Sequence, residues 1–106
     1  MLKIEDTCAT TEVFKNYEVI FKALADQKRL HLLNILSVNG SSCVCDLINE
    51  LDMPQSKLSY HLKILLNANL ITKETKGTWS YYEVKEEQMN AVLSNDLCCV
   101  FKPSYN

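Results

Sequence analysis

The feature that most constrains the fold of this chain is a change in the spacing of its apolar residues near residue 69. Before that point apolar residues recur every three or four positions, which is the spacing of amphipathic helices. Segments 70–75 and 79–84 are instead rich in β-branched and aromatic residues, and they flank Lys76-Gly77-Thr78, a typical hairpin turn. Helical spacing then returns from Glu86 to Phe101. The sequence therefore predicts a mostly α-helical domain with one small β-hairpin.

Four helices are expected before the hairpin. The first covers residues 13–24, and the second ends at Asn39-Gly40, where glycine can take a left-handed C-terminal cap. Its apolar residues are Leu30, Leu33, Ile35 and Leu36. A short third helix spans about 43–51, with N-cap oxygens available from Ser41 and Ser42. The fourth spans about 54–68, and helical spacing places its leucines Leu58, Leu62 and Leu65 on one face.

The third and fourth helices are joined by the short turn Asp52-Met53-Pro54. Two helices joined by such a turn form a helix-turn-helix, whose second helix, the recognition helix, reads DNA. A hairpin directly after it makes a winged helix. We therefore expect one domain over residues 1–106, a winged helix-turn-helix in the order α-α-α-α-β-β-α. Its parts are an N-terminal arm at 1–12, the helix-turn-helix at 43–68, the wing at 70–84 and a last helix at 86–101.

The distribution of charge favours a nucleic-acid partner, although the whole chain has a net charge of −2 and a pI of about 5.6. Residues 55–82 have a balance of +3, whereas residues 1–54 have −3 and residues 83–106 have −2. The lysines of the positive segment are Lys57, Lys63, Lys73 and Lys76. Positive charge thus gathers on the expected recognition helix and wing, where phosphates are met.

The chain has five cysteines, an odd number that cannot pair completely. The first residues, 1–14, carry acids where a secretory signal has a basic segment, and no apolar run is long enough to cross a membrane. We therefore expect a cytoplasmic protein whose thiols stay reduced. Cys43 and Cys45 fall in the first turn of the third helix, where the helix dipole favours thiolate, the form that binds soft ions. Since residues two apart on a helix diverge by about 200°, an ion held by both is expected to distort that turn.

Four segments resemble the ArsR/SmtB family of metal-responsive repressors. Phe21 to Leu30 resembles the family's opening motif, and Cys43-Val44-Cys45-Asp46-Leu47 resembles the cysteine motif of its arsenic and cadmium/lead branches. Gln55 to Lys63 resembles the family's recognition helix, and Gly77 to Tyr82 resembles its wing. The resemblance covers about residues 14–100. It implies a homodimeric repressor that binds double-stranded operator DNA upstream of resistance genes. It also implies dimerisation through the first and last helices, 13–24 and 86–101, and release by a toxic metal or metalloid.

The resemblance makes Cys43 and Cys45 the first choice for the sensor thiols. A third cysteine found in one version of the motif would fall at Ile48, which cannot coordinate an ion. Trivalent arsenic prefers three thiolates, or two plus another donor. The missing ligand is expected from Cys98 or Cys99, or from Cys8 of the partner subunit; Cys98 and Cys99 could also form a separate site. The expected inducers are As(III) or Sb(III), with Cd(II) or Pb(II) as alternatives, and no resident cofactor is required.

The residues expected to contact DNA lie on the recognition helix and at the hairpin tip. They are Gln55, Ser56, Ser59, Tyr60, Lys63 and Lys76. Their hydroxyl, amide and ammonium groups suit phosphates and base edges, and a glutamine can pair with adenine. His61 borders the leucine face, so a structural role and a DNA contact both remain open. Trp79 is expected to pack against the wing.

Two rival functions follow from the cysteines. A thiol-based enzyme is disfavoured because the chain contains no Cys-x-x-Cys and no glycine-rich anion loop. A repressor of the same fold that senses oxidants through a disulfide stays open. The zinc- and nickel-sensing branches of the family fit less well, because they place histidine and acidic ligands along the last helix, whereas the two histidines here are His31 and His61.

Overall fold

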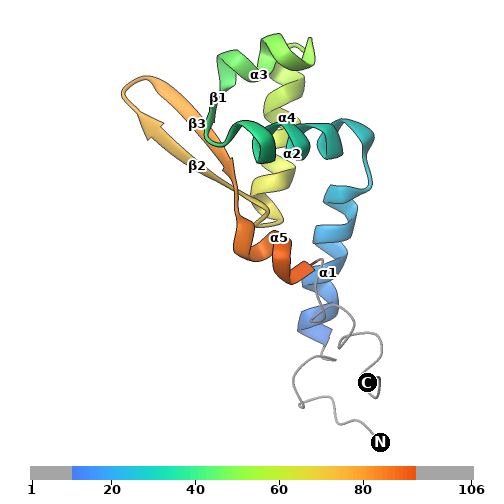
Figure 1. The fold of residues 1–106 in the computed structure, drawn as a ribbon. Coiled ribbons are helices and arrows are strands. Elements are labelled where there is room, and N and C mark those ends of the chain that lie inside the picture. The colour runs from blue at the N-terminus through green and yellow to red at the C-terminus, as the bar shows by residue number, and fades with distance from the viewer. Residues whose placement is uncertain (1–10, 93–106) are drawn as a thin grey trace, which may run out of the picture.

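A computed structural model describes residues 11–92 and shows the helices and the hairpin in the expected order (Figure 1). The first two helices are α1 (Thr11–Leu24) and α2 (Gln27–Asn39). A short strand, β1 (Ser42–Cys43), precedes α3 (Val44–Leu51) and α4 (Gln55–Asn67). The hairpin consists of β2 (Ile71–Lys76) and β3 (Trp79–Val84), and α5 begins at Glu86 and is described to Val92. The predicted class, mostly α with a small hairpin, is confirmed.

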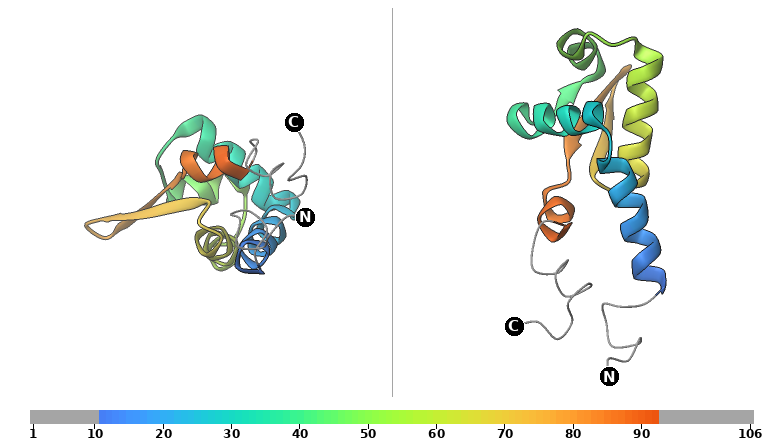
Figure 2. Two further views of the ribbon diagram at one scale, coloured as in Figure 1. Left: turned by 90° about the horizontal axis from the view of Figure 1, so that it is seen from below. Right: turned by 90° about the vertical axis from the view of Figure 1, so that its right-hand side faces the viewer.

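The three strands form one antiparallel sheet with β3 in the centre, between β1 and β2. Along the hairpin, Lys76 pairs with Trp79 and Ile71 pairs with Val84, so the turn falls at Gly77-Thr78 as predicted. On the other edge, Ser42 pairs with Tyr82 and Cys43 pairs with Tyr81. The hairpin extends away from the helices, which gives the wing its shape (Figure 1 and Figure 2).

The core is formed where α2, α3 and α4 meet the base of the sheet. All three leucines predicted for the inner face of α4 are buried, and so are Leu47 of α3 and Ile71 of β2. On α2 the buried face consists of Arg29, Leu32, Leu33, Ile35 and Leu36. Leu30, which the spacing had included among the apolar residues of this helix, is half exposed. An arginine therefore occupies a position on the inward face of α2.

The start of α2 is well defined by its N-cap, Asp26. Its side chain accepts hydrogen bonds from the backbone N–H groups of Lys28 (2.8 Å) and Arg29 (3.2 Å), which the helix itself leaves unpaired. The Arg29 N–H is the main reason that the pKa of the Asp26 carboxyl lies below its usual value. The cap starts α2 at Gln27, so only two residues separate it from the end of α1 at Leu24.

The segment between α2 and α3 differs from the prediction. Cys43 belongs to β1 and is the N-cap of α3 rather than a residue of its first turn, because its backbone pairs with the wing. The expected serine cap is also wrong, since the Ser42 hydroxyl donates instead to the carbonyl of Gly40 at 2.9 Å. Gly40 does end α2, but with φ 78° and ψ −152°, a region that is essentially restricted to glycine and not the left-handed cap that was expected.

Helices α1 and α5 lie toward the end of the molecule opposite α3 (Figure 1 and Figure 2). The predicted last helix runs to residue 101, and the part beyond Val92 lies outside the described residues, as do Cys8, Cys98 and Cys99. Within residues 11–92, none of the helices has both the length and the apolar character needed to cross a membrane.

Candidate DNA-binding surface and cysteine site

The outer face of α4 carries the side chains predicted to contact DNA. Every one of the five predicted α4 residues is exposed, and they are Gln55, Ser56, Ser59, Tyr60 and Lys63. The leucines at one-turn spacing hold the opposite face of α4 in the core, so the polar face must point outward. Tyr60 is a large side chain on this helix, and 61% of the residue is exposed. The surface therefore offers hydroxyl, amide and ammonium groups together.

His61 does not belong to this outer surface. Only 4% of the residue is exposed, and its ring contacts the guanidinium of Arg29. Of the two roles that the sequence left open, the structural one is correct. Sequence reasoning missed Arg29, although two signals were present: it is the one arginine of the chain, and it lies three, four and seven positions before Leu32, Leu33 and Leu36.

The wing carries lysines whose ammonium groups lie over tyrosine rings. The Nζ of Lys76 is 5.3 Å from the ring centroid of Tyr81, and the Nζ of Lys73 is 6.0 Å from that of Tyr82. Such cation–π contacts orient the long lysine side chains along the hairpin while their charge remains in water. Trp79, directly opposite Lys76 near the tip, is 55% exposed. The expectation that Trp79 packs against the wing stays a prediction.

The two cysteines of the Cys-x-Cys motif lie side by side. Their Sγ atoms are 2.9 Å apart, and neither takes part in a disulfide. They meet because Cys43 is extended, with φ −76° and ψ 147°, while Cys45 is already helical. The 200° divergence of a regular helix therefore does not apply. An ion could be held by both thiols without distorting the first turn of α3, which removes the premise of the predicted distortion.

The pKa of Cys45 also differs from the prediction. The pKa of the Cys45 thiol is raised above its usual value, first because the thiol shares a hydrogen bond with Cys43, and further by desolvation. The helix N-terminus alone had suggested the opposite direction. A second negative charge beside the first is unfavourable, so a soft cation that binds both sulfurs must displace their protons. Cys45 is exposed and Cys43 is buried, so access is from the Cys45 side.

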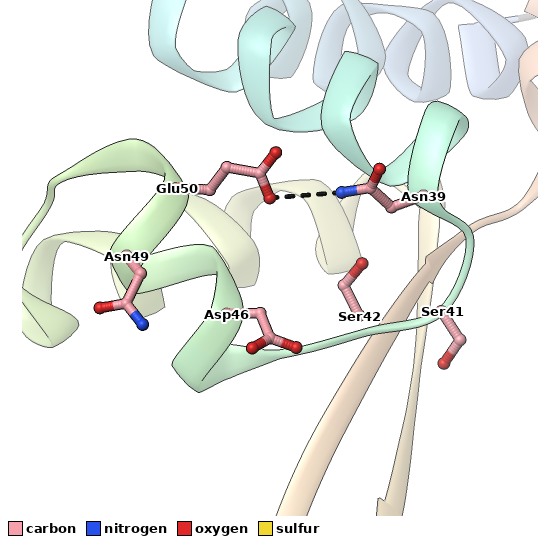
Figure 3. Close-up of a pocket in the computed structure, with 6 residues that line it drawn as sticks. All are labelled: Asn39, Ser41, Ser42, Asp46, Asn49 and Glu50. Atoms are coloured by element: carbon pink, nitrogen blue, oxygen red, sulfur yellow. Dashed lines mark hydrogen bonds between the residues drawn. The ribbon is translucent and has the colours of Figure 1, made fainter.

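A polar hollow lies between the end of α2 and α3 (Figure 3). It is lined by Asn39, Ser41, Ser42, Asp46, Asn49 and Glu50. The Nδ2 of Asn39 donates to Glu50 across the hollow at 3.3 Å, which connects the two helices. Its oxygen atoms suit hard cations rather than soft ones, and its carboxylates would repel phosphates. Within residues 11–92 no three metal-ligating side chains cluster, so Cys43 and Cys45 stand as a pair there.

A second surface, apolar in character, lies on α1. A groove there is lined by Phe14, Tyr17, Glu18, Phe21, Lys22 and Ala25. Phe14 is 47% exposed, and the rings of Tyr17 and Phe21 are tilted by 33° to each other at a centroid distance of 5.8 Å. Exposed aromatic side chains that gather on one helix face are typical of a protein interface.

The sequence is similar to those of known transcriptional regulators. The family described as "Bacterial regulatory protein, arsR family" matches residues 26–73. The chain is 60% identical to the arsenical resistance operon repressor of Bacillus subtilis, over 87% of this chain and 88% of the relative. It is 31% identical to a cadmium resistance transcriptional regulatory protein CadC homolog of Staphylococcus aureus, over 70% and 61% of the two chains.

The fold agrees with solved structures. A homodimeric winged helix-turn-helix DNA-binding domain from Mycobacterium bovis superposes with a TM-score of 0.68 at 24% identity, over 81% of this chain and 85% of that one. The prediction of a regulator rather than an enzyme is confirmed, because the matched family consists of DNA-binding regulators. The chain belongs to the ArsR family of bacterial transcriptional regulators.

Proposed function

We propose that this protein represses a metalloid resistance operon as a homodimer, and that As(III) or Sb(III) releases it from DNA by binding Cys43 and Cys45. The observation that carries the proposal is the pair of sulfur atoms 2.9 Å apart where β1 meets α3. Soft ions prefer thiolates over the oxygen ligands nearby. The arsenical resistance repressor of Bacillus subtilis, at 60% identity, supports a metalloid inducer.

In this proposal α4 is the recognition helix and the hairpin is the wing, within the helix-turn-helix at 43–68 and the wing at 70–84. Tyr60, Gln55 and the serines of α4 meet base edges and phosphates, and Lys63 and Lys76 meet phosphates. The support is the exposure of all these side chains on one helix face and one hairpin. The carboxylates of Asp46 and Glu50 in the polar hollow between α2 and α3 would repel DNA, which also favours α4 as the helix in the groove.

Dimerisation is proposed through α1 and the helix that begins at Glu86. The apolar groove on α1 supplies surface that a partner subunit would cover, and both helices lie at the same end of the molecule (Figure 2). The Mycobacterium bovis domain with this fold is a homodimer. Two subunits can read two half-sites about 34 Å apart, one turn of DNA, so modest positive surfaces suffice for tight binding.

The geometry suggests a route from the thiols to the DNA. Cys43 pairs with Tyr81 across β1 and β3, and directly paired residues lie on the same face of a sheet. The ring of Tyr81 in turn lies under the ammonium of Lys76, near the tip of the wing. An ion that pulls on Cys43 therefore moves the wing strand that positions Lys76. This route replaces the distortion of α3 as the proposed cause of release.

A third ligand completes the site in this proposal. Trivalent arsenic and antimony prefer three donors, and residues 11–92 supply two neighbouring thiols. Cys98 and Cys99 are the first candidates, with Cys8 of the partner subunit as the alternative. Cd(II) and Pb(II) are the alternative inducers, supported by the cadmium resistance relative.

The proposal is tested by following operator binding with fluorescence anisotropy while arsenite, antimonite, cadmium, lead and zinc are titrated in parallel under reducing conditions. We expect arsenite and antimonite to release the DNA at the lowest concentrations. If no ion releases it, but an oxidant does so reversibly, the protein is instead a thiol redox sensor. The short distance between the sulfurs is the observation that favours this second candidate.

We predict that Lys63→Ala and Lys76→Ala each weaken operator binding for all sequences and reduce the slope of log K against log salt by about one counterion. Lys15→Ala, which removes an exposed lysine from α1, is the matched control and should leave the slope unchanged. Tyr60→Ala should instead change the preference among operator sequences. An anisotropy salt series compares the three lysine variants with the wild type, and titrations on different operator sequences test Tyr60→Ala. Lysine variants of α4 and the wing with the wild-type slope would contradict the assignment.

The single tryptophan gives a direct test of the route through the wing. Trp79 is in β3, two residues before Tyr81, and is half exposed. We expect arsenite to change its fluorescence intensity or emission maximum in the wild-type protein without DNA. The Cys43→Ser variant should show no change. Release of DNA without any change in Trp79 emission would exclude the wing route while leaving the thiol sensor intact.

A further inference from the structure

A buried arginine, Arg29, connects three helices of the domain. Its Nε donates to the carbonyl of Ala23 at 2.7 Å, and its Nη2 donates to the carbonyl of Lys22 at 3.3 Å. Both carbonyls are in the last turn of α1, where helical carbonyls lack partners within the helix. Arg29 itself is in the first turn of α2 and is only 9% exposed. The guanidinium therefore caps α1 from α2.

The same guanidinium reaches the recognition helix. Its Nη1 donates to Nδ1 of His61 on α4 at 3.0 Å, and the histidine is 4% exposed. Asp26 lies beside the pair, with its Oδ2 3.9 Å from Nη1. A planar group with several fixed donors suits this task, because its hydrogen bonds set both the distance and the angle between the helices.

The hydrogen bond requires one particular form of the His61 ring. Nδ1 can accept from Arg29 only when it carries no proton, so the neutral ring has its proton on Nε2. That Nε2 is buried and has no hydrogen-bond partner among the described residues. When the ring is protonated, both nitrogens are donors, the bond to Arg29 is lost, and two cations face each other in a buried site.

The ring of His61 also touches the DNA-binding surface. The ring of Tyr60 lies edge-on to it at a centroid distance of 5.3 Å, and Tyr60 is the most exposed aromatic residue of α4. A change in the position of His61 therefore changes the support beneath Tyr60. The contacts form a continuous path from α1 through Arg29 and His61 to a side chain proposed to reach the bases.

We propose that Arg29 and His61 form a latch that positions the recognition helix, and that operator binding requires the unprotonated ring of His61. The proposal rests on the proposed binding of operator DNA and is independent of the cysteines. Both residues are positioning residues, since neither reaches DNA itself. Because of the latch, acid should weaken operator binding. A histidine that simply gained charge near DNA would instead strengthen it.

The charges around His61 determine the sign of this effect. Burial is the main reason that the pKa of His61 lies below its usual value of 6.5; Arg29, Lys57 and Lys28 lower it further, whereas Asp26 alone among the charged groups acting on it raises it. The unfolded chain therefore takes up the proton before the native protein does. The contribution of the latch to stability is complete above pH 6.5 and declines as the pH falls below it, toward the lower native pKa.

The test is operator binding of the full chain from about pH 7.5 down to about pH 5, at constant ionic strength, by fluorescence anisotropy. We expect the Kd to rise by up to about tenfold per pH unit once the pH is below the native pKa of His61, because only the unprotonated fraction binds. A histidine that simply gained charge near phosphates would instead strengthen binding in acid. Binding that strengthens or stays constant in acid would overturn the proposal.

Three variants make the result specific. His61→Gln retains an acceptor for Arg29 and cannot be protonated in this range, so it should bind like the wild type at pH 7.5 and lose the acid dependence. His31→Gln, at an exposed position on α2, should retain it. His61→Leu removes the acceptor and should weaken binding at every pH, with circular dichroism to show whether it folds.

The acid profile of His61→Gln decides the question even if His61→Leu does not fold. If that profile matches the wild type, the latch is wrong. Failure of the wild type to bind any operator at pH 7.5 would instead refute the proposed function, so the two failures are distinguishable.

Discussion

Replacement of Cys43 or Cys45 by serine is expected to abolish release from the operator while leaving repression intact. A serine hydroxyl stays protonated at neutral pH and is a poor ligand for a soft ion, so the inducer loses one of two adjacent donors. We expect the arsenite concentration needed for half release to rise by about 100-fold or more, the upper range of such couplings. The Kd for operator without inducer should stay within about threefold of wild type, because neither sulfur lies on the α4 face or at the tip of the wing.

The measurement is an anisotropy titration of the preformed complex with arsenite. Asn49→Ser, an exposed polar change one turn after Cys45 on α3, serves as the matched control and should respond like wild type. Cys98→Ser and Cys99→Ser should impair the response only if the C-terminal pair completes the site, and Cys8→Ser only under the cross-subunit arrangement. A Cys43→Ser variant that still left DNA at wild-type arsenite concentrations would make the C-terminal pair the leading sensor.

The second large effect is expected at the apolar groove of α1. Phe14→Lys should produce a folded monomer, because Phe14 is half exposed and contributes nothing to the buried core. A monomer reads one half-site, so operator affinity should fall by about 10²–10⁴-fold, the usual gain from linking two binding events. The added positive charge would by itself strengthen DNA binding, so it works against the expected result and cannot explain it.

Val38→Lys is the control for Phe14→Lys. Val38 is 75% exposed on α2, and the same substitution there should leave the dimer intact and should not weaken operator binding. Sedimentation velocity gives the oligomeric state, and anisotropy on duplexes with one or two half-sites gives the affinity. A Phe14→Lys protein that remains dimeric with wild-type affinity would show that α1 is not the interface.

Much of the fold was predictable because its determinants are local. Helical spacing over 13–24 and 54–68, the turn residues at Gly77 and the β-branched and aromatic segments beside it each act within a few residues of the chain. The boundaries predicted from these patterns agree with those of α1, α4, β2 and β3 to within a few residues. The outward face of α4 followed from the same spacing, since the leucines of one face determine where the polar side chains point.

Other features depended on residues that lie far apart in the chain. Strand β1 has two residues and no spacing of its own to detect, and it exists because Ser42 and Cys43 pair with Tyr82 and Tyr81 about forty positions later. That pairing extends Cys43 and brings its sulfur beside that of Cys45. The helical prediction had placed the two thiols apart, so the local rule gave the wrong geometry for the site.

The amino-acid sequence alone predicted the order of the helices and of the hairpin, the turn of the wing, the polar face of the recognition helix and the presence of a soft-ligand motif. How these parts meet depends on the folded structure: the thiols lie at the edge of the wing sheet, half of Trp79 is exposed, and Arg29 donates a hydrogen bond to His61 across 32 positions of the chain. The physical reason is that periodicity and turn chemistry act between neighbours in sequence. Strand pairing, burial and the choice of partner for a buried charge arise only when distant segments pack together.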